Sequence, residues 1–266
     1  MLILQKGNFL GNIQYLYSTG GATVSATGYA EGDICADSMH YHEHPNIYFI
    51  LNGGSTEKKH GKETELRTGS LRFYYAGEQH RNIRTACSES INIEIETSLL
   101  LQEGLTEAYI REAAYSVPCF KSSILKIFRE LKSTAPSAAC LDMLLLELIA
   151  LAQKEDGGNA RPPWTATLRD FLNDCWDEPF TLQQLSDVVK INPISISKHF
   201  PRHFGCTLSE YTRRLKVDRA IALVKQKELP LTDIAYSCGF ADQSHFIRVF
   251  KSQTGYAPGE YRKVSL

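Results

Sequence analysis

Two segments near the C-terminal end of this 266-residue chain repeat the same apolar, turn and aromatic residues about fifty positions apart. "ISISKHFPRHFGCTLSEYTR" begins at residue 194, and "QSHFIRVFKSQTGYAPGEYR" begins at residue 243. The matched residues are Phe200, Gly205, Glu210 and Tyr211 in the first copy and Phe250, Gly255, Glu260 and Tyr261 in the second. A short helical pattern and a tight turn precede each copy, at residues 182–192 and 232–241. This arrangement predicts two helix-turn-helix units, whose second helices could each enter a DNA major groove about 12 Å wide.

The polar face of each second helix predicts the contacts to DNA. Ile196 and Phe200 in one copy, and Phe246 and Phe250 in the other, recur at helical spacing and should pack on the preceding helix. The residues expected to face DNA are Ile194, Ser195, Ser197 and Lys198 in the first copy and Gln243, Ser244, His245 and Arg248 in the second. Because Gln can pair bidentately with adenine and Arg with guanine, we expect the second helix to read base edges more strongly.

The segment between the copies, residues 208–226, has 19 residues and would form a helix about 28 Å long. Such a helix could hold the two reading helices about 34 Å apart, which is one turn of DNA. Arg213, Arg214 and Lys216 interrupt its apolar pattern and should face solvent or phosphates. From Thr181 onward there are 13 Lys and Arg against 7 Asp and Glu, whereas the earlier residues have 16 against 23. This asymmetry suits a partner that carries phosphates.

The apolar spacing alone would also fit a helical protein-interaction module. The matched Phe, Gly and Tyr residues favour DNA binding, and residues 166–263 resemble the double helix-turn-helix domain of the AraC/XylS transcription regulators. The matching stretches are "DIAYSCGFADQSHFIRVFKSQTGYAPGEYR" and the more divergent "LQQLSDVVKINPISISKHFPRHFGCTLSEY". The chain departs from the family at three positions. Ser186 stands where the family usually has Ala, Lys190 where it often has Gly, and Pro201 where it usually has a basic residue. The resemblance implies sequence-specific binding to double-stranded promoter DNA, more often as an activator than as a repressor, with RNA polymerase as a partner.

The N-terminal part of the chain has the pattern of short strands. Residues 20–97 alternate, most clearly in "INIEIE" (91–96), where Ile91, Ile93 and Ile95 face one way and the polar residues face the other. Breaks that contain Gly separate this run from similar runs at 47–51 and 71–75. Several short strands at this spacing predict a small antiparallel barrel or sandwich.

Histidines gather in two segments of this region. His40, His42 and His44 alternate in "HYHEHPNIYFILNGG", so an extended strand would place all three on one face. Together with His80 in "TGSLRFYYAGEQHRN", they resemble the paired motifs of the cupin barrel, in which two His, a Glu and a later His bind a metal. No Glu follows at the usual spacing, so no cofactor is expected, and a metal at His42, His44 and His80 is a weak alternative. A purely structural role for these histidines stays open beside a binding role. The family resemblance favours a small-molecule effector pocket lined by some of His42, His44, Tyr48, Tyr74, His80 and Asn82.

Helical spacing begins after residue 99, and the candidate helix at 138–154 has two apolar sides. One side contains Leu141, Leu144, Leu145, Leu148, Ile149 and Ala152, and the other contains Met143, Leu146 and Ala150. An exposed helix needs only one apolar stripe. The second side is therefore buried within its own domain or forms the seam of a homodimer. The stretch "EDGGNARPP" (155–163) then interrupts the pattern and is the best linker candidate.

We therefore predict an α+β protein with four parts. These are a cupin-like β-barrel sensor domain (1–98), a helical dimerisation segment (99–155), a linker (156–163) and an all-α double helix-turn-helix domain (164–266). The function is expected to be effector-controlled transcription regulation without enzymatic activity. The alternatives are a metal-dependent cupin enzyme with an appended DNA-binding region and a regulator that answers to a protein partner. Without a signal segment or an apolar run of about 20 residues, we expect a cytoplasmic protein that does not enter a membrane.

Overall fold

A computed structural model describes residues 1–30, 38–85, 87–152, 162–177 and 180–266. The chain divides into two compact units, the first formed by residues 1–153 with 260–266 and the second by residues 154–259. Most of the predicted linker, residues 156–161, lies outside the described residues. The domain boundaries given above stay predictions.

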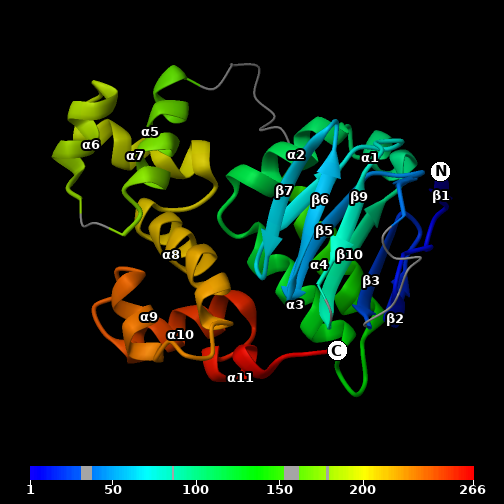
Figure 1. The fold of residues 1–266 in the computed structure, drawn as a ribbon. Coiled ribbons are helices and arrows are strands. Elements are labelled where there is room, and N and C mark those ends of the chain that lie inside the picture. The colour runs from blue at the N-terminus through cyan, green and yellow to red at the C-terminus, as the bar shows by residue number, and fades with distance from the viewer. Residues whose placement is uncertain (31–37, 86, 153–161, 178–179) are drawn as a thin grey trace. The chain divides into compact units, whose positions relative to one another are not determined.

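The first unit is rich in strands (Figure 1). They are β1 (Leu2–Leu4), β2 (Asn12–Ser18), β3 (Ala22–Tyr29), β4 (His40–His42), β5 (Asn46–Asn52), β6 (Gly54–Lys59), β7 (Lys62–Arg67), β8 (Leu71–Tyr74), β9 (Arg81–Arg84) and β10 (Ser88–Ile95). A five-stranded sheet has the order β2-β3-β10-β5-β8, a three-stranded sheet has the order β7-β6-β9, and β1 pairs with β4. The strands predicted at 47–51, 71–75 and 91–96 correspond to β5, β8 and β10.

The helices follow the strands along the chain (Figure 1). They are α1 (Thr97–Gln102), α2 (Glu107–Ser116), α3 (Phe120–Leu131), α4 (Ala138–Ala150), α5 (Pro163–Asp174), α6 (Leu182–Val189), α7 (Pro193–Phe204), α8 (Leu208–Val224), α9 (Leu231–Ser237), α10 (Gln243–Thr254) and α11 (Pro258–Lys263). A sheet-rich N-terminal region followed by a helical C-terminal region confirms the predicted α+β class.

The two faces of the five-stranded sheet differ in chemistry, and the strands β3, β5 and β10 are buried on both faces. Cross-strand register places Tyr17 opposite Val24 and Val24 opposite Ile93, so these side chains share one face. Helix α4 contacts this face, because the Tyr17 hydroxyl donates a hydrogen bond of 2.7 Å to Asp142. On the other face, Asn92 donates hydrogen bonds to the hydroxyls of two β3 residues, at 3.3 and 3.2 Å. The polar side of β10 therefore lines the interior of the first unit.

Helix α4 buries one of its two apolar sides. Leu141, Leu145, Leu148 and Ile149 are each at most 2% exposed. On the opposite side, Met143 is 63% exposed and Leu146 is 51% exposed. The described residues of the chain therefore leave the second side exposed.

The second unit is helical and is organised around α8 (Figure 1). Helices α5 to α7 share a core that includes Leu168, Leu185, Ile196 and Phe200. Helix α8 packs against α7 and also against α9 and α10. In the part of the chain that the structure describes, no helix is both long enough and apolar enough to cross a membrane.

Candidate functional site

The N-terminal end of α7 presents the first set of predicted DNA-facing residues. The side chain of Asn192 caps the helix by accepting a hydrogen bond of 2.9 Å from the amide of Ile194, and Pro193 occupies the first helical position. Ile196 and Phe200 are buried, as their spacing predicts. Ile194 is 77% exposed, Ser197 and Lys198 are exposed, and Ser195 is half-buried. Most of the predicted reading face is thus accessible.

The N-terminal end of α10 presents the second set. Asp242 caps the helix by accepting a hydrogen bond of 2.7 Å from the amide of His245, and Phe246 and Phe250 are fully buried. Ser244 and Arg248 are exposed, whereas Gln243 and His245 are half-buried. These two half-buried side chains are held by neighbours that the sequence analysis did not identify. The hydroxyl of Thr232 donates a hydrogen bond of 2.7 Å to Gln243 Oε1, and the ring of Phe240 contacts the His245 ring at a centroid distance of 5.5 Å.

Three basic residues of α8 were predicted to face solvent or phosphates, and one of them does not. Arg213 and Arg214 are partly exposed, and Arg214 forms an ion pair with Glu210 one turn earlier. The ammonium of Lys216 instead donates a hydrogen bond to the carbonyl of Gly239 and lies 5.8 Å from the centre of the Phe240 ring. Burial accordingly lowers the pKa of Lys216. The prediction for Lys216 is wrong, because its long side chain reaches the turn of the second motif.

The turns of the two motifs each contain a residue with a positive φ. Lys190 ends α6 with φ 55°, and its counterpart Gly239 follows α9 with φ 69°. The left-handed region is costly for a residue with a Cβ atom but not for Gly. The sequence departure at Lys190 is therefore a backbone cost in the first turn, and the turn itself is preserved.

The family comparisons agree with this geometry. The family described as "Helix-turn-helix domain" matches residues 185–264. The chain is also 22% identical, over 84% of its length and 87% of the relative, to the "HTH-type transcriptional activator RhaS" of Shigella sonnei (strain Ss046). This similarity extends across both units. Together these matches support an AraC/XylS-type transcription regulator.

Two further comparisons each cover less than half of this chain. The chain is 30% identical over 124 residues to the "Uncharacterized HTH-type transcriptional regulator YpdC" of Escherichia coli (strain K12). These residues make up 46% of this chain and 44% of that protein. The chain is also similar to the crystal structure of an AraC-type transcriptional regulator from Chromobacterium violaceum. The match covers 38% of this chain and 89% of that protein, with 22% identity and a TM-score of 0.36. That TM-score is too low to add to the assignment.

Three histidines meet in the first unit, but they are not the three that alternation predicts. His40, His42 and His80 are buried, and their ligand atoms lie within 4.8 Å of one another. β4 ends at His42 and the chain bends at Glu43 and His44, so His44 leaves the strand and lies near Glu96. The Pro45 that follows is the sequence signal for this break. His40, which was not a predicted site residue, takes the third position.

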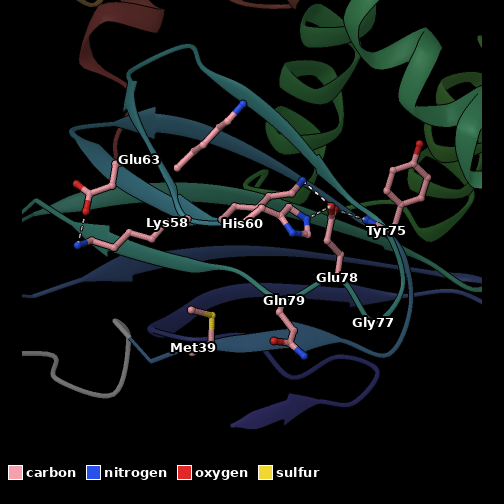
Figure 2. A pocket seen from close by; sticks show the side chains of 11 residues that line it. Met39, Lys58, His60, Glu63, Tyr75, Gly77, Glu78 and Gln79 are labelled. Atoms are coloured by element: carbon pink, nitrogen blue, oxygen red, sulfur yellow. Dashed lines mark hydrogen bonds and ion pairs between the residues drawn. The ribbon is translucent and has the colours of Figure 1, made fainter.

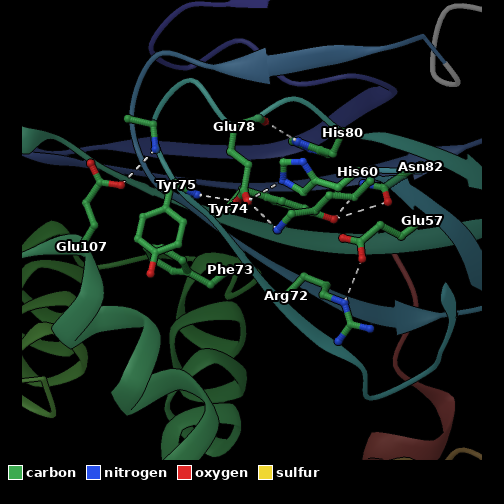
Figure 3. Close-up of polar contacts among 12 residues, drawn as sticks. Glu57, His60, Arg72, Phe73, Tyr74, Tyr75, Glu78, His80, Asn82 and Glu107 are labelled. Atoms are coloured by element: carbon green, nitrogen blue, oxygen red, sulfur yellow. Dashed lines mark hydrogen bonds and ion pairs between the residues drawn. The ribbon is translucent and has the colours of Figure 1, made fainter. Parts of the chain in front are cut away.

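The remaining predicted effector residues surround a small interior cavity. Its lining includes His42, Tyr48, Tyr74, His80 and Asn82, and its volume is about 10 Å³. The rings of Tyr74 and His80 are stacked at a centroid distance of 3.6 Å, and Tyr74 hydrogen-bonds with Asn82 (Figure 3). This space is enough for about one water molecule. In this conformation the interior therefore does not admit an organic molecule.

Burial also controls the protonation of the three clustered histidines. It lowers the pKa of His40 to about 4, of His42 to about 3 and of His80 to about 2. All three imidazoles are consequently neutral near pH 7. Neutral imidazoles can donate a lone pair, which makes them possible metal ligands.

A much larger groove lies at the surface of the same unit, beside the hairpin of β6 and β7 (Figure 2). Its volume is about 680 Å³, which is within the usual range for small-molecule sites. The charged residues that line it are Lys58, Lys59, His60, Lys62, Glu63 and Glu78. Glu78 pairs with Lys59 at 2.6 Å, and its other carboxylate oxygen accepts a hydrogen bond from the amide of Tyr75. No sequence pattern pointed to this groove, because it is formed by a hairpin and a loop that are distant in sequence.

Proposed function

We propose that this DNA-binding transcription regulator recognises promoters in two parts, with α7 and α10 reading successive segments of the major groove, and that it acts mainly as an activator. One observation supports the proposal: each of the two helices has exposed reading residues near its N-terminal end, and each packs against the same helix α8. The 17 residues of α8 give it a length of about 25 Å. This length suits two reading heads separated by about one turn of DNA.

Each reading helix has its own chemistry. Gln243 and Arg248 offer bidentate contacts to adenine and guanine, and Ser244 and His245 offer shorter polar contacts. On α7, Ile194 suits the methyl group of thymine, while Ser195, Ser197 and Lys198 contact base edges or phosphates. Arg213 and Arg214 contact the phosphate backbone. We therefore expect stronger base preference in the part of the site that α10 reads.

Selection of bound sequences from random double-stranded DNA tests this proposal. The expected result is an enriched motif with two parts about one helical turn apart. Arg248→Ala should relax the preference at one base of one part, and Ile194→Ala should relax it in the other part. The absence of a two-part motif, or relaxation of the same part by both variants, would contradict the proposal.

The controlling signal acts on the sensor unit, and cavity sizes favour the surface groove for an organic effector. The residues first predicted to bind the effector surround a space of about 10 Å³, so the side chains there would have to move apart to admit one. The surface groove of about 680 Å³ is lined by more basic than acidic side chains. An acidic small molecule is the effector class that this lining suits.

A thermal-shift screen of organic acids, with neutral sugars as the contrast, tests the groove. Lys59→Met should abolish the shift that a binding acid causes, and Lys126→Met on α3 should leave it intact. A shift that survives Lys59→Met would place the effector elsewhere.

A regulator controlled by a protein partner is the second candidate, and the filled interior of the sensor favours it. In that case no small molecule would change DNA affinity, and a partner protein would bind the sensor unit. Neither candidate requires catalysis, and we do not assign an enzymatic activity. Both place the protein in the cytoplasm, with RNA polymerase as the partner at the promoter.

The uncovered side of α4 suits a homodimer. Met143 and Leu146 are large apolar residues exposed on one side of a helix whose other side is buried. A second copy of the chain could cover this side in a two-fold contact. Leu146→Glu should convert a dimer into a monomer in light scattering, while Glu147→Gln on the same helix should not. A wild-type chain that is monomeric at micromolar concentration would contradict this proposal.

A further inference from the structure

We propose that His40, His42 and His80 bind one divalent transition-metal ion of the zinc type inside the sensor unit. Their ligand atoms lie within 4.8 Å of one another, and all three residues are at most 4% exposed. The backbones of His40 and His80 are locked together, because the amide of each donates to the carbonyl of the other at 3.0 and 2.9 Å. The cluster therefore rests on paired strands and not on loose side chains.

Hydrogen bonds fix the ring nitrogens of two of these histidines for coordination. Nδ1 of His40 lies 2.8 Å from the carbonyl of Ser38, and Nδ1 of His80 lies 3.0 Å from the carbonyl of Glu78. A carbonyl can only accept, so each Nδ1 must carry the proton and each Nε2 must carry the lone pair. Donation of the second ring N–H to a backbone carbonyl is the arrangement that orients histidine ligands in metal sites.

The third histidine has a buried nitrogen that needs a partner. Nδ1 of His42 makes no hydrogen bond among the described residues, and the same is true of the side-chain oxygen of Asn46. The Asn46 amide lies 3.4 Å from Nε2 of His42. If Nδ1 of His42 binds the ion, Nε2 carries the proton. Rotation of the Asn46 amide by half a turn, which exchanges its nitrogen and oxygen, then lets Nε2 donate to the Asn46 oxygen. Coordination would thus satisfy two buried polar atoms that are otherwise unpaired.

The size and composition of the site restrict the ion. A cavity of about 10 Å³ admits one ion or water but no organic ligand. Three imidazoles without a carboxylate suit zinc and related ions and do not suit Mg²⁺ or Ca²⁺. Tetrahedral coordination would bring the nitrogens to about 3.3 Å from one another, so the side chains must close slightly around the ion.

The charge of Arg84 acts against a bound cation. This buried guanidinium lines the same cavity and lowers the pKa of all three histidines by its positive charge. Three protein ligands leave a fourth position open on a zinc-type ion. We expect an anionic ligand such as hydroxide or chloride in that position, where it would also face the positive charge in the cavity.

Titration calorimetry of the full chain with Zn²⁺ alone, after removal of bound metal by a chelator, tests the proposal. We expect one ion per chain, and we expect His42→Gln and His80→Gln each to weaken binding by about a hundredfold. His44→Gln and His60→Gln are the matched controls, since these histidines lie outside the cluster, and both should bind like the wild type. Equal affinity in all variants, or no stoichiometric binding by the wild type, would overturn the proposal.

A measurement on the unmodified protein guards against variants that do not fold. X-ray absorption of the wild type with one equivalent of Zn²⁺ should show three nitrogen ligands at about 2.0–2.1 Å. A shell that contains sulfur, or only the oxygen ligands of a hydrated surface ion, would contradict the site. Neither measurement involves DNA, so failure here leaves the two-part promoter recognition unaffected.

Discussion

The hydroxyl of Thr232, on α9, donates a hydrogen bond of 2.7 Å to Oε1 of Gln243, the first residue of α10. This contact ties the first helix of the second motif to a side chain predicted to read adenine. One lone pair of Oε1 and both amide protons of Gln243 stay available for a base. The bond therefore orients the side chain without consuming its recognition groups.

Removal of this contact should weaken recognition of one base. Thr232→Val keeps the shape of the side chain but removes the donor, and we expect a loss of about 0.5–1.5 kcal/mol in DNA binding. Gln243→Ala should cost about 1–3 kcal/mol and relax the preference at the same base. Fluorescence anisotropy with matched and single-base-changed DNA measures both. Thr212→Val, which removes a hydroxyl from α8, is the control, and an equal loss in that variant would argue against an orienting role.

Lys216 and Arg213 should behave differently, although both are basic residues of α8. Arg213→Ala should weaken binding to all sequences and reduce the salt dependence by about one phosphate contact. Lys216→Met should leave the salt dependence unchanged, because its ammonium bonds to the carbonyl of Gly239. It should instead destabilise the second motif by about 1–2 kcal/mol. Salt titrations of DNA affinity, combined with thermal unfolding, separate the two effects. A reduced salt dependence in Lys216→Met would show that Lys216 contacts phosphate.

Lys190→Gly should stabilise the protein by about 0.5–1 kcal/mol. The left-handed conformation at φ 55° costs a Lys residue about 1–2 kcal/mol, and the greater chain entropy of unfolded Gly offsets part of the gain. Lys225 is also the C-cap of a helix but has φ −73°, so Lys225→Gly should not stabilise. Thermal unfolding of the two variants beside the wild type decides between these expectations. Destabilisation by both substitutions would mean that the side chain of Lys190 matters more than its backbone.

Glu94 should make the stability of the sensor unit depend on pH. Burial raises the pKa of Glu94 from 4.5 to about 7, so the folded state holds its proton over a range in which the unfolded chain has lost it. Stability should therefore fall as pH rises from about 4.5 to about 7, by at most about 3 kcal/mol. Glu94→Gln should be more stable than the wild type at pH 8 and similar to it at pH 4.5.

Glu96→Gln provides a control of opposite sign for that experiment. The hydrogen bond from Lys6 lowers the pKa of Glu96, so this carboxylate contributes stability above its unfolded pKa. Its removal should therefore destabilise at pH 8. Thermal unfolding at the two pH values measures both variants, and a Glu94→Gln variant less stable than the wild type at pH 8 would contradict the account.

The helical unit was largely predictable from the sequence because its signals are local. The helical pattern predicted within residues 182–192 forms α6, and the second helix predicted for the first copy forms α7. Thr181 and Asn192 cap these helices, and Pro193 occupies the first position of α7. Periodicity and capping act within a few residues, so a single sequence contains them.

The sensor interior was less predictable because its contacts are not local. The alternation of "INIEIE" was correct in direction, yet Glu94 is only 1% exposed, and its carboxylate accepts a hydrogen bond of 2.8 Å from the amide of Gly7. Likewise, the spacing of three histidines suggested His44, but the chain bends after His42 and brings His40 to His80. Sequence periodicity shows which residues share one face of a strand, but it does not show which other part of the chain covers that face.

Insertion of about five base pairs between the two parts of a selected DNA site tests the central claim most directly, because it rotates one part by half a helical turn relative to the other. If α7 and α10 read successive segments of one groove from a single chain, affinity should fall about a hundredfold or more. An insertion of one full turn would restore the facing of the two parts but not their separation, so it should also bind weakly. Unchanged affinity after the half-turn insertion would contradict two-part reading by these two helices.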